Sequence, residues 1–185
     1  MSVNKSNEQD PKQVYEKKTP AQEKTLVIDD TNDGAHDGMF DGIKNSELWI
    51  NTKPFVAPIT KGRVIKVYDG DTITVAAKLP KTLESPLYRF SVRLNGIDTP
   101  ELKTKNEVEK RVALQARDAL SAKILYRDVE LRNVQTEKYG RLLAEIWLGN
   151  ECLNKWMITH RFAVKYDGGT KVSPDNWEDY LRDIN

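Results

Sequence analysis

An Asp-Gly pair between two β-branched segments places the strongest constraint on the fold of this chain. Residues 63–68 and 71–77 are rich in Val, Ile and Thr, and Asp69-Gly70 separates them. β-Branched side chains favour strands, and Asp-Gly favours the tight turn of a hairpin. Residues 88–97 follow with apolar and polar side chains in alternation, as in a strand with one buried face. We therefore expect three consecutive strands joined by hairpins.

A helical pattern follows the third strand. Within residues 108–125, Val112, Ala116, Leu120 and Ile124 recur at every fourth position and form one apolar stripe. The later segments predict strands over 129–134 and 142–148 and helices over 151–161 and 176–182. Five short strands with a helix between the third and the fourth are typical of an OB-type barrel. The predicted fold class is α+β, a five-stranded Greek-key barrel of the OB type with about three helices.

The chain changes character near residue 60. Residues 1–48 are dense in charged and amide side chains and predict a flexible acidic arm. Residues 49–60 are more apolar and contain two prolines, as in a strap or linker, and residues 61–185 contain the predicted barrel and helices. Residues 1–60 carry 7 Lys and Arg against 10 Asp and Glu, whereas the remainder carries 22 against 18. This mild positive charge of the barrel permits a polyanionic ligand but does not by itself indicate one.

Several protein classes are disfavoured by what the sequence lacks. Its single cysteine, Cys152, cannot form an internal disulfide and has no partner for a thiolate zinc site. No stretch approaches about 18 consecutive apolar residues, and the first ten residues lack the apolar core of a signal peptide. We expect a monomer that does not bind a membrane and resides inside the cell, in a compartment that the sequence leaves open.

Acidic residues occur on two predicted loops that are remote in sequence. Asp69 and Asp71 lie in the first turn, and Asp98 and Glu101 follow the third strand. Carboxylate oxygens without His or Cys suit calcium or magnesium, and a site that adds main-chain carbonyls and water suits calcium best. Arg93 lies five residues before Asp98, on the polar face of its strand. Its planar, permanently charged guanidinium matches phosphate oxygens.

Each of these features alone has an ordinary explanation as a turn, a helix N-cap or an exposed arginine. Their combination is much more specific. The chain has Asp-Gly-Asp-Thr at 69–72, Arg93 five residues before the Asp-Thr-Pro-Glu at 98–101, and Lys-Tyr-Gly-Arg at 138–141. With the strands and helices between them, these motifs resemble the staphylococcal nuclease (thermonuclease) family over residues 61–167.

The resemblance implies a calcium-dependent endonuclease, a phosphodiesterase that cuts DNA and RNA with little sequence preference by in-line attack of water on phosphorus. It implies that Asp71, Asp98 and the main-chain carbonyl of Thr99 bind the Ca²⁺ ion, with Asp69 close by. The sequence does not decide whether DNA, RNA or both are the natural substrate.

The resemblance also assigns residues to the substrate. Arg93 and Arg141 are expected to bind the scissile phosphate, and Glu101 to act on the attacking water as general base or orienting group. Three further residues fall where the family holds a terminal phosphate of the bound nucleotide: Lys138, Tyr139 and, more weakly, Tyr166.

Two other functions stay open. One is a non-catalytic nucleic-acid or protein binding module on the same barrel, as in the nuclease-like repeats of Tudor-containing coactivators. Such modules typically lack the acidic and arginine residues present here. The other is a calcium-dependent structural or regulatory protein that uses the Asp-rich segment 29–34, whose match to a calcium loop is poor. The long loop 78–87 and the short segment 102–107 also depart from the family's pattern.

Overall fold

The computed structural model of this chain describes residues 45–80, 84–137 and 139–182. The chain divides into two units, residues 1–53 and residues 54–185. The described part of the first unit contains helix α1, Asn45–Asn51. The sequence predicted no helix there, because seven residues are too few for an apolar period to stand out. Most of the predicted arm, including its Asp-rich segment, lies outside the described residues.

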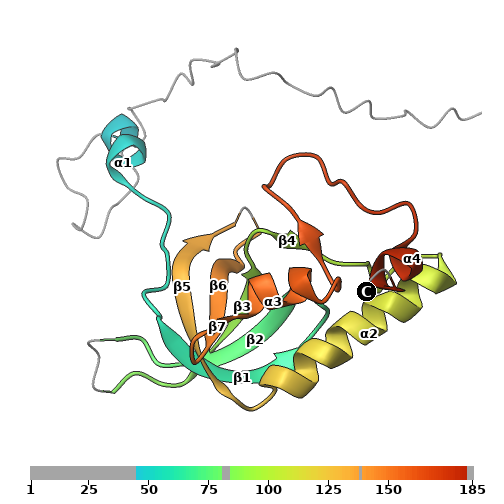
Figure 1. Cartoon of the computed structure of the whole chain (residues 1–185). Helices are drawn as coiled ribbons and strands as arrows, with labels where there is room; N and C mark the ends of the chain where they lie inside the picture. Colours follow the sequence, from blue (N-terminus) through green and yellow to red (C-terminus); the bar gives the residue numbers. More distant parts are fainter. Residues whose placement is uncertain (1–44, 81–83, 138, 183–185) are drawn as a thin grey trace, which may run out of the picture. The chain divides into compact units, whose positions relative to one another are not determined.

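A closed barrel of five strands forms the centre of the second unit (Figure 1). The strands are β1 Lys61–Val67, β2 Thr72–Ala77, β3 Tyr88–Leu94, β5 Asp128–Thr136 and β6 Leu142–Leu148. They pair antiparallel in the order β3-β2-β1-β5-β6, and a parallel pairing of β3 with β6 closes the circle. The predicted five-stranded barrel of the OB type is confirmed.

Alternating side chains fill the interior of the barrel. Ile73 and Val75 on β2 and Val92 and Leu94 on β3 are fully buried, because every second residue of a strand points to the same face. The segment before β1 also contributes to the core, since Ile59 is only 2% exposed. The residues between the apolar ones point to the other face of the sheet, where polar side chains are tolerated.

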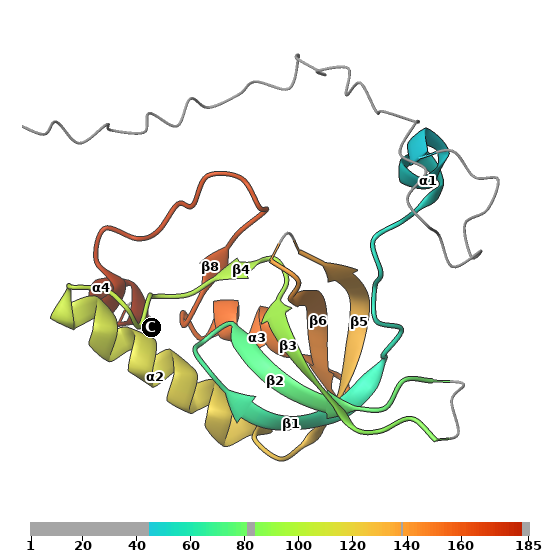
Figure 2. The same ribbon diagram turned by 180° about the vertical axis from the view of Figure 1, so that it is seen from behind.

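Helix α2, Glu107–Ile124, contacts β1 and lies beside α4, Trp177–Arg182 (Figures 1 and 2). Its N-cap is Asn106, whose Oδ1 accepts hydrogen bonds from the N–H groups of Val108 and Glu109. The whole predicted apolar stripe is buried: Val112, Ala116, Leu120 and Ile124. None of the helices in the described ranges is long and apolar enough to cross a membrane.

Two short strand pairs attach the C-terminal part of the chain to the barrel. β7, Glu151–Cys152, pairs with the end of β6, so α3, Leu153–Thr159, begins two residues later than predicted. β4, Ile97–Asp98, pairs antiparallel with β8, Val164–Lys165 (Figure 2). The pairing of β4 with β8 places the C-terminal segment next to Asp98.

A buried asparagine ties these parts together. Asn154, at the start of α3, is 4% exposed. Its Oδ1 accepts a hydrogen bond from the Ile146 N–H (2.9 Å), and its Nδ2 donates to the carbonyls of Asn95 (2.7 Å) and Ala144 (3.2 Å). One side chain therefore connects β6, the loop before β4 and α3.

We predict that Asn154→Leu lowers the free energy of unfolding by about 2–4 kcal/mol, because the Ile146 N–H and the Asn95 carbonyl lose a buried partner. Urea unfolding followed by circular dichroism measures the change. The control is Asn150→Leu, the same replacement at an exposed turn position, where the change should stay within about 0.5 kcal/mol. Equal losses in the two variants would contradict the role given to the Asn154 side chain.

Candidate active site

Asp71 is held in the turn between β1 and β2. Its N–H donates to Asp69 Oδ1 (3.1 Å), and its own Oδ1 accepts from the Thr72 hydroxyl (2.9 Å). Gly70 lets this turn approach the loop that contains Asp98, because a methyl group on Gly70 would lie 3.0 Å from Thr99 Cγ2. The Asp71 residue is only 3% exposed. The turn thus holds a buried carboxylate close to the segment that contains Asp98 and Thr99.

Arg93 joins this carboxylate to a second one. It lies near the end of β3, opposite Thr72 in the β2–β3 register. One guanidinium nitrogen, Nη1, lies 2.5 Å from Asp71 Oδ2, and the other, Nη2, lies 3.1 Å from Asp98 Oδ1. The Arg93 side chain is 15% exposed, and both carboxylates are buried. The structure therefore brings together three of the predicted site residues around one guanidinium.

Glu101 joins this group through a residue that the sequence analysis missed. Lys171 Nζ lies 2.8 Å from Asp98 Oδ1 and 2.9 Å from Glu101 Oε1. The backbone N–H of Glu101 also donates to Glu109 Oε1 on α2 (3.1 Å). Lys171 belongs to no local motif, since it reaches the site from the segment after β8. The only signal that could have found it is the β4–β8 pairing, which no local pattern reveals.

Arg141 stands at the start of β6, after a tight turn. The turn is closed by hydrogen bonds from the Glu137 N–H to the Arg141 carbonyl and from the Gly140 N–H to the Glu137 carbonyl (both 2.9 Å), and Gly140 has a φ of +80°. Arg141 Nε donates to Glu137 Oε1. This hydrogen bond is the main cause of a raised pKa of Arg141, to which the charges of Asp71 and Asp69 add. Glu137 is a second residue that the sequence analysis missed.

The other predicted site residues differ in how far they are exposed to solvent. Thr99 is buried directly after Asp98, at 5% exposed. Tyr139 is 73% exposed, and the Tyr166 hydroxyl donates to the carbonyl of Gly169 (3.1 Å). Lys138 lies outside the described residues. The structure therefore assembles the acidic residues and Arg93 directly, and it leaves the proposed contacts of the tyrosines with a nucleotide as predictions.

Two ionisable groups of the site, Asp71 and Lys171, have raised pKa values. Burial raises the pKa of Asp71 to about 7, and the neighbouring Asp69 adds to this rise, against the opposing effects of Arg93 and the Thr72 hydroxyl. Burial tends to lower the pKa of Lys171, but its hydrogen bonds and charge interactions with Asp98 and Glu101 leave it raised. The carboxylates therefore favour additional positive charge.

The donor set fits a hard divalent cation. Asp71 and Asp98 both contact one guanidinium, so their carboxylates are close enough for one cation to neutralise both. Oxygen donors are the ligands that Ca²⁺ and Mg²⁺ prefer. Among the described residues, no group of three or more His, Cys, Asp or Glu side chains has metal-binding geometry. A cation here would therefore take two carboxylates and complete its coordination with main-chain and water oxygens.

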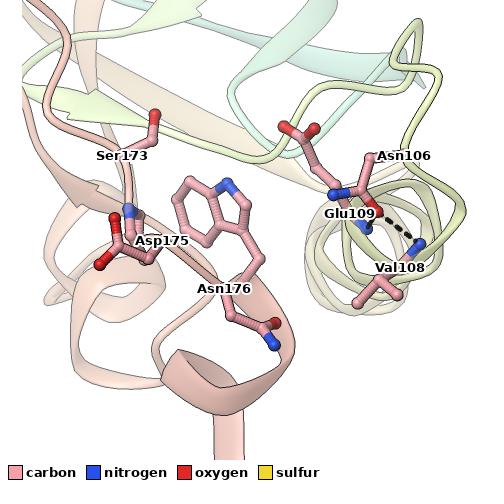
Figure 3. Close-up of a pocket in the computed structure, with 8 residues that line it drawn as sticks. Asn106, Val108, Glu109, Ser173, Asp175 and Asn176 are labelled. Atoms are coloured by element: carbon pink, nitrogen blue, oxygen red, sulfur yellow. Dashed lines mark hydrogen bonds between the residues drawn. The ribbon is translucent and has the colours of Figure 1, made fainter.

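A pocket of about 260 Å³ lies next to the site, between the first turns of α2 and α4 (Figure 3). It is lined by residues 173–177 and by Asn106, Val108 and Glu109. Three of these lining residues are joined by the N-cap hydrogen bonds of Asn106 (Figure 3). Glu109 connects it to the site, because its carboxylate also accepts the Glu101 N–H.

A known protein family matches the part of the chain that contains most of the site residues. A family model described as staphylococcal nuclease homologue matches residues 91–183, about half of the chain. The match begins within β3 and ends after α4, so it includes Arg93, Asp98, Glu101 and Arg141 but not Asp71.

Two of the following three relatives are named as nucleases. The chain is 34% identical to the thermonuclease of Staphylococcus hyicus over 103 residues, 55% of this chain and 56% of that protein. It is 33% identical to protein ParB of Escherichia coli over 97 residues, 51% and 46% of the two chains. It is 28% identical to an uncharacterized endonuclease of Haemophilus influenzae over 104 residues, 56% and 51%. The chain spans about half the length of these curated relatives.

The raised pKa of Asp71 predicts that stability falls as the pH rises. In the folded protein Asp71 loses its proton near pH 7, whereas in the unfolded chain it has lost it near pH 4. From pH 5 to pH 8 this difference removes about 2–3 kcal/mol of unfolding free energy from the wild type. In Asp71→Asn this loss of unfolding free energy between the two pH values should be absent. Urea unfolding with chelator present measures it.

Asp118→Asn is the matched control, because Asp118 is 65% exposed on α2. It should retain the pH dependence of the wild type. If Asp71→Asn and the wild type lose the same stability between the two pH values, Asp71 does not carry the effect.

Proposed function

The chain belongs to the family of staphylococcal nuclease homologues, and on that premise we propose that it is a metal-dependent nuclease that hydrolyses phosphodiester bonds of DNA, RNA or both. We further propose that Ca²⁺ is the ion and that cleavage has little sequence preference. The observation that carries the proposal is the contact of one guanidinium, that of Arg93, with two buried carboxylates from segments remote in sequence, Asp71 and Asp98.

Burial of such a group has a physical cost that points to function. Removing carboxylates from water is unfavourable, and a buried ion pair is often no more stable than apolar residues of the same size. Burial raises the pKa of Asp71 to about 7, even though Arg93 opposes the rise. Perturbed groups of this kind concentrate at functional sites. A barrel that needed only stability would gain more from apolar side chains at these positions.

In the proposed reaction each residue has the role that its chemistry allows. Asp71, Asp98 and the main-chain carbonyl of Thr99 would hold the cation, with Asp69 near them, and the bound cation would supply positive charge for the phosphate oxygens. Attack of water in line on phosphorus builds negative charge on the equatorial oxygens. The guanidinium groups of Arg93 and Arg141 stabilise that charge because the fold holds them in advance.

Glu101 would act on the attacking water. It lies within the same ion-pair network, through Lys171, and its backbone is held by Glu109. With 62% of its side chain exposed, it can reach solvent water. A carboxylate in this position can accept or orient the proton of the nucleophile. We propose that Lys138, Tyr139 and Tyr166 bind a further phosphate of the substrate.

Incubation of the full chain with plasmid DNA and with RNA tests the proposal. We expect cleavage of at least one substrate with Ca²⁺ and none with excess chelator. Binding of either nucleic acid without cleavage under any divalent cation would instead support the non-catalytic binding module. Replacing Ca²⁺ by Mg²⁺ or Mn²⁺ tests the choice of ion separately.

We predict that Arg141→Ala slows cleavage by about 10²- to 10³-fold, the loss typical of one group that stabilises developing negative charge. Initial rates at saturating Ca²⁺ measure the effect, and the thermal unfolding midpoint checks that the fold is intact. Arg111→Ala is the control, because Arg111 is exposed on α2 and pairs with Glu178 of α4. A rate for Arg141→Ala within a few-fold of the control would remove Arg141 from the proposed mechanism.

A further inference from the structure

One lysine ammonium group occupies a position that the proposed function does not use. Lys171 Nζ makes two salt bridges, to Asp98 (2.8 Å) and to Glu101 (2.9 Å). These carboxylates have different proposed roles, one in holding the cation and the other in acting on water. The ammonium group thus supplies positive charge where the proposed function requires a dication.

The two cationic groups at Asp98 differ in how firmly they are held. Arg93 Nη2 and Lys171 Nζ both contact the same oxygen, Asp98 Oδ1. Arg93 comes from the barrel strand β3 and is 15% exposed, and its other nitrogen is held by Asp71. Lys171 comes from the segment between β8 and α4 and is 45% exposed. Of the two groups, Lys171 is the one that can leave without disturbing the barrel.

We propose that Lys171 is an internal competitor for the divalent cation and so determines how tightly the acidic residues bind it. This inference rests on the proposed function for the identity of the cation site. In the cation-free protein the ammonium group forms ion pairs with Asp98 and Glu101 and offsets part of their negative charge. A dication that binds Asp98 repels the ammonium group, and Lys171 leaves that carboxylate for solvent. The free energy of breaking this ion pair is subtracted from the free energy of cation binding.

Isothermal titration of the full chain with Ca²⁺ alone tests the inference. A hydrogen bond to a charged group contributes roughly a factor of ten to a binding constant, so Lys171→Gln should bind Ca²⁺ about tenfold more tightly than the wild type. Lys171→Arg keeps the positive charge and should bind like the wild type.

The matched control is Lys165→Gln. Lys165 is exposed on β8, six residues before Lys171, and it makes no salt bridge in the part of the chain that the structure describes. This variant removes the same charge from the same segment without breaking the ion pair. We expect its Ca²⁺ dissociation constant to change by less than about twofold.

A second measurement follows the ammonium group directly. In ¹⁵N NMR of the lysine side chains, Ca²⁺ should shift or broaden the resonance of Lys171, which is identified by its absence from Lys171→Gln. The resonance of Lys165, identified in the same way, should stay in place.

The outcomes separate this inference from the proposed function. Unchanged or weaker Ca²⁺ binding by Lys171→Gln, equal effects of the two glutamine variants, or an unmoved Lys171 resonance would each overturn the competition. Absence of cleavage with every divalent cation would reject the nuclease. The competition would still be judged from the ratio of the Ca²⁺ dissociation constants of the wild type and Lys171→Gln. A cleaving enzyme with identical Ca²⁺ binding in the wild type and Lys171→Gln would keep the nuclease and reject the competitor.

Discussion

The contact of Arg93 with Asp71 and Asp98 is the interaction on which the rest of the site depends. Two buried carboxylates close together repel each other and lose their hydration, and the guanidinium between Asp71 and Asp98 opposes both effects. Its position comes from β3, whose register with β2 places Arg93 opposite Thr72, directly after Asp71. The strand pairing of the barrel thereby sets the geometry of the charged cluster.

The elements outside the barrel bring further groups to this cluster. The β4–β8 pairing carries the segment of Lys171 to Asp98. Helix α2 holds the backbone of Glu101 through Glu109 and packs beside α4. The cluster is therefore fixed on one side by the barrel, where Asp71 is buried and Arg93 is 15% exposed, and is more exposed on the other, where Glu101 and Lys171 face solvent. The charges on the barrel side are held rigidly, and those on the other side are accessible. This arrangement suits a site that binds a ligand from solution.

Much of this structure could be predicted from local pattern, and the remainder could not for identifiable reasons. Alternation and β-branching revealed the five strands, and the four-residue spacing revealed the buried face of α2. The acidic and arginine residues were recognised only in combination, because each motif alone is an ordinary turn or cap. Lys171 was missed because its partner, Asp98, is remote in sequence and only the folded chain brings the two together. Glu137 is only four residues from Arg141, but an acidic residue in a polar turn does not by itself reveal which side chain it pairs with. The two-residue strand β7 shortened α3 for a similar reason, since it exists only through its pairing with β6.

The parallel pairing of β3 with β6 has one more consequence. In this ladder Val92 is opposite Leu142 and Arg93 is opposite Leu143, so Arg93 and Arg141 stand on the two edges that meet when the sheet becomes a cylinder. Such a ladder joins strands far apart in sequence, and its formation is entropically costly until most of the sheet exists. An intermediate with this seam still open would hold every residue of the site and yet keep its two arginines apart. We therefore expect the two arginines proposed to bind the phosphate to come together only when the β3–β6 ladder forms.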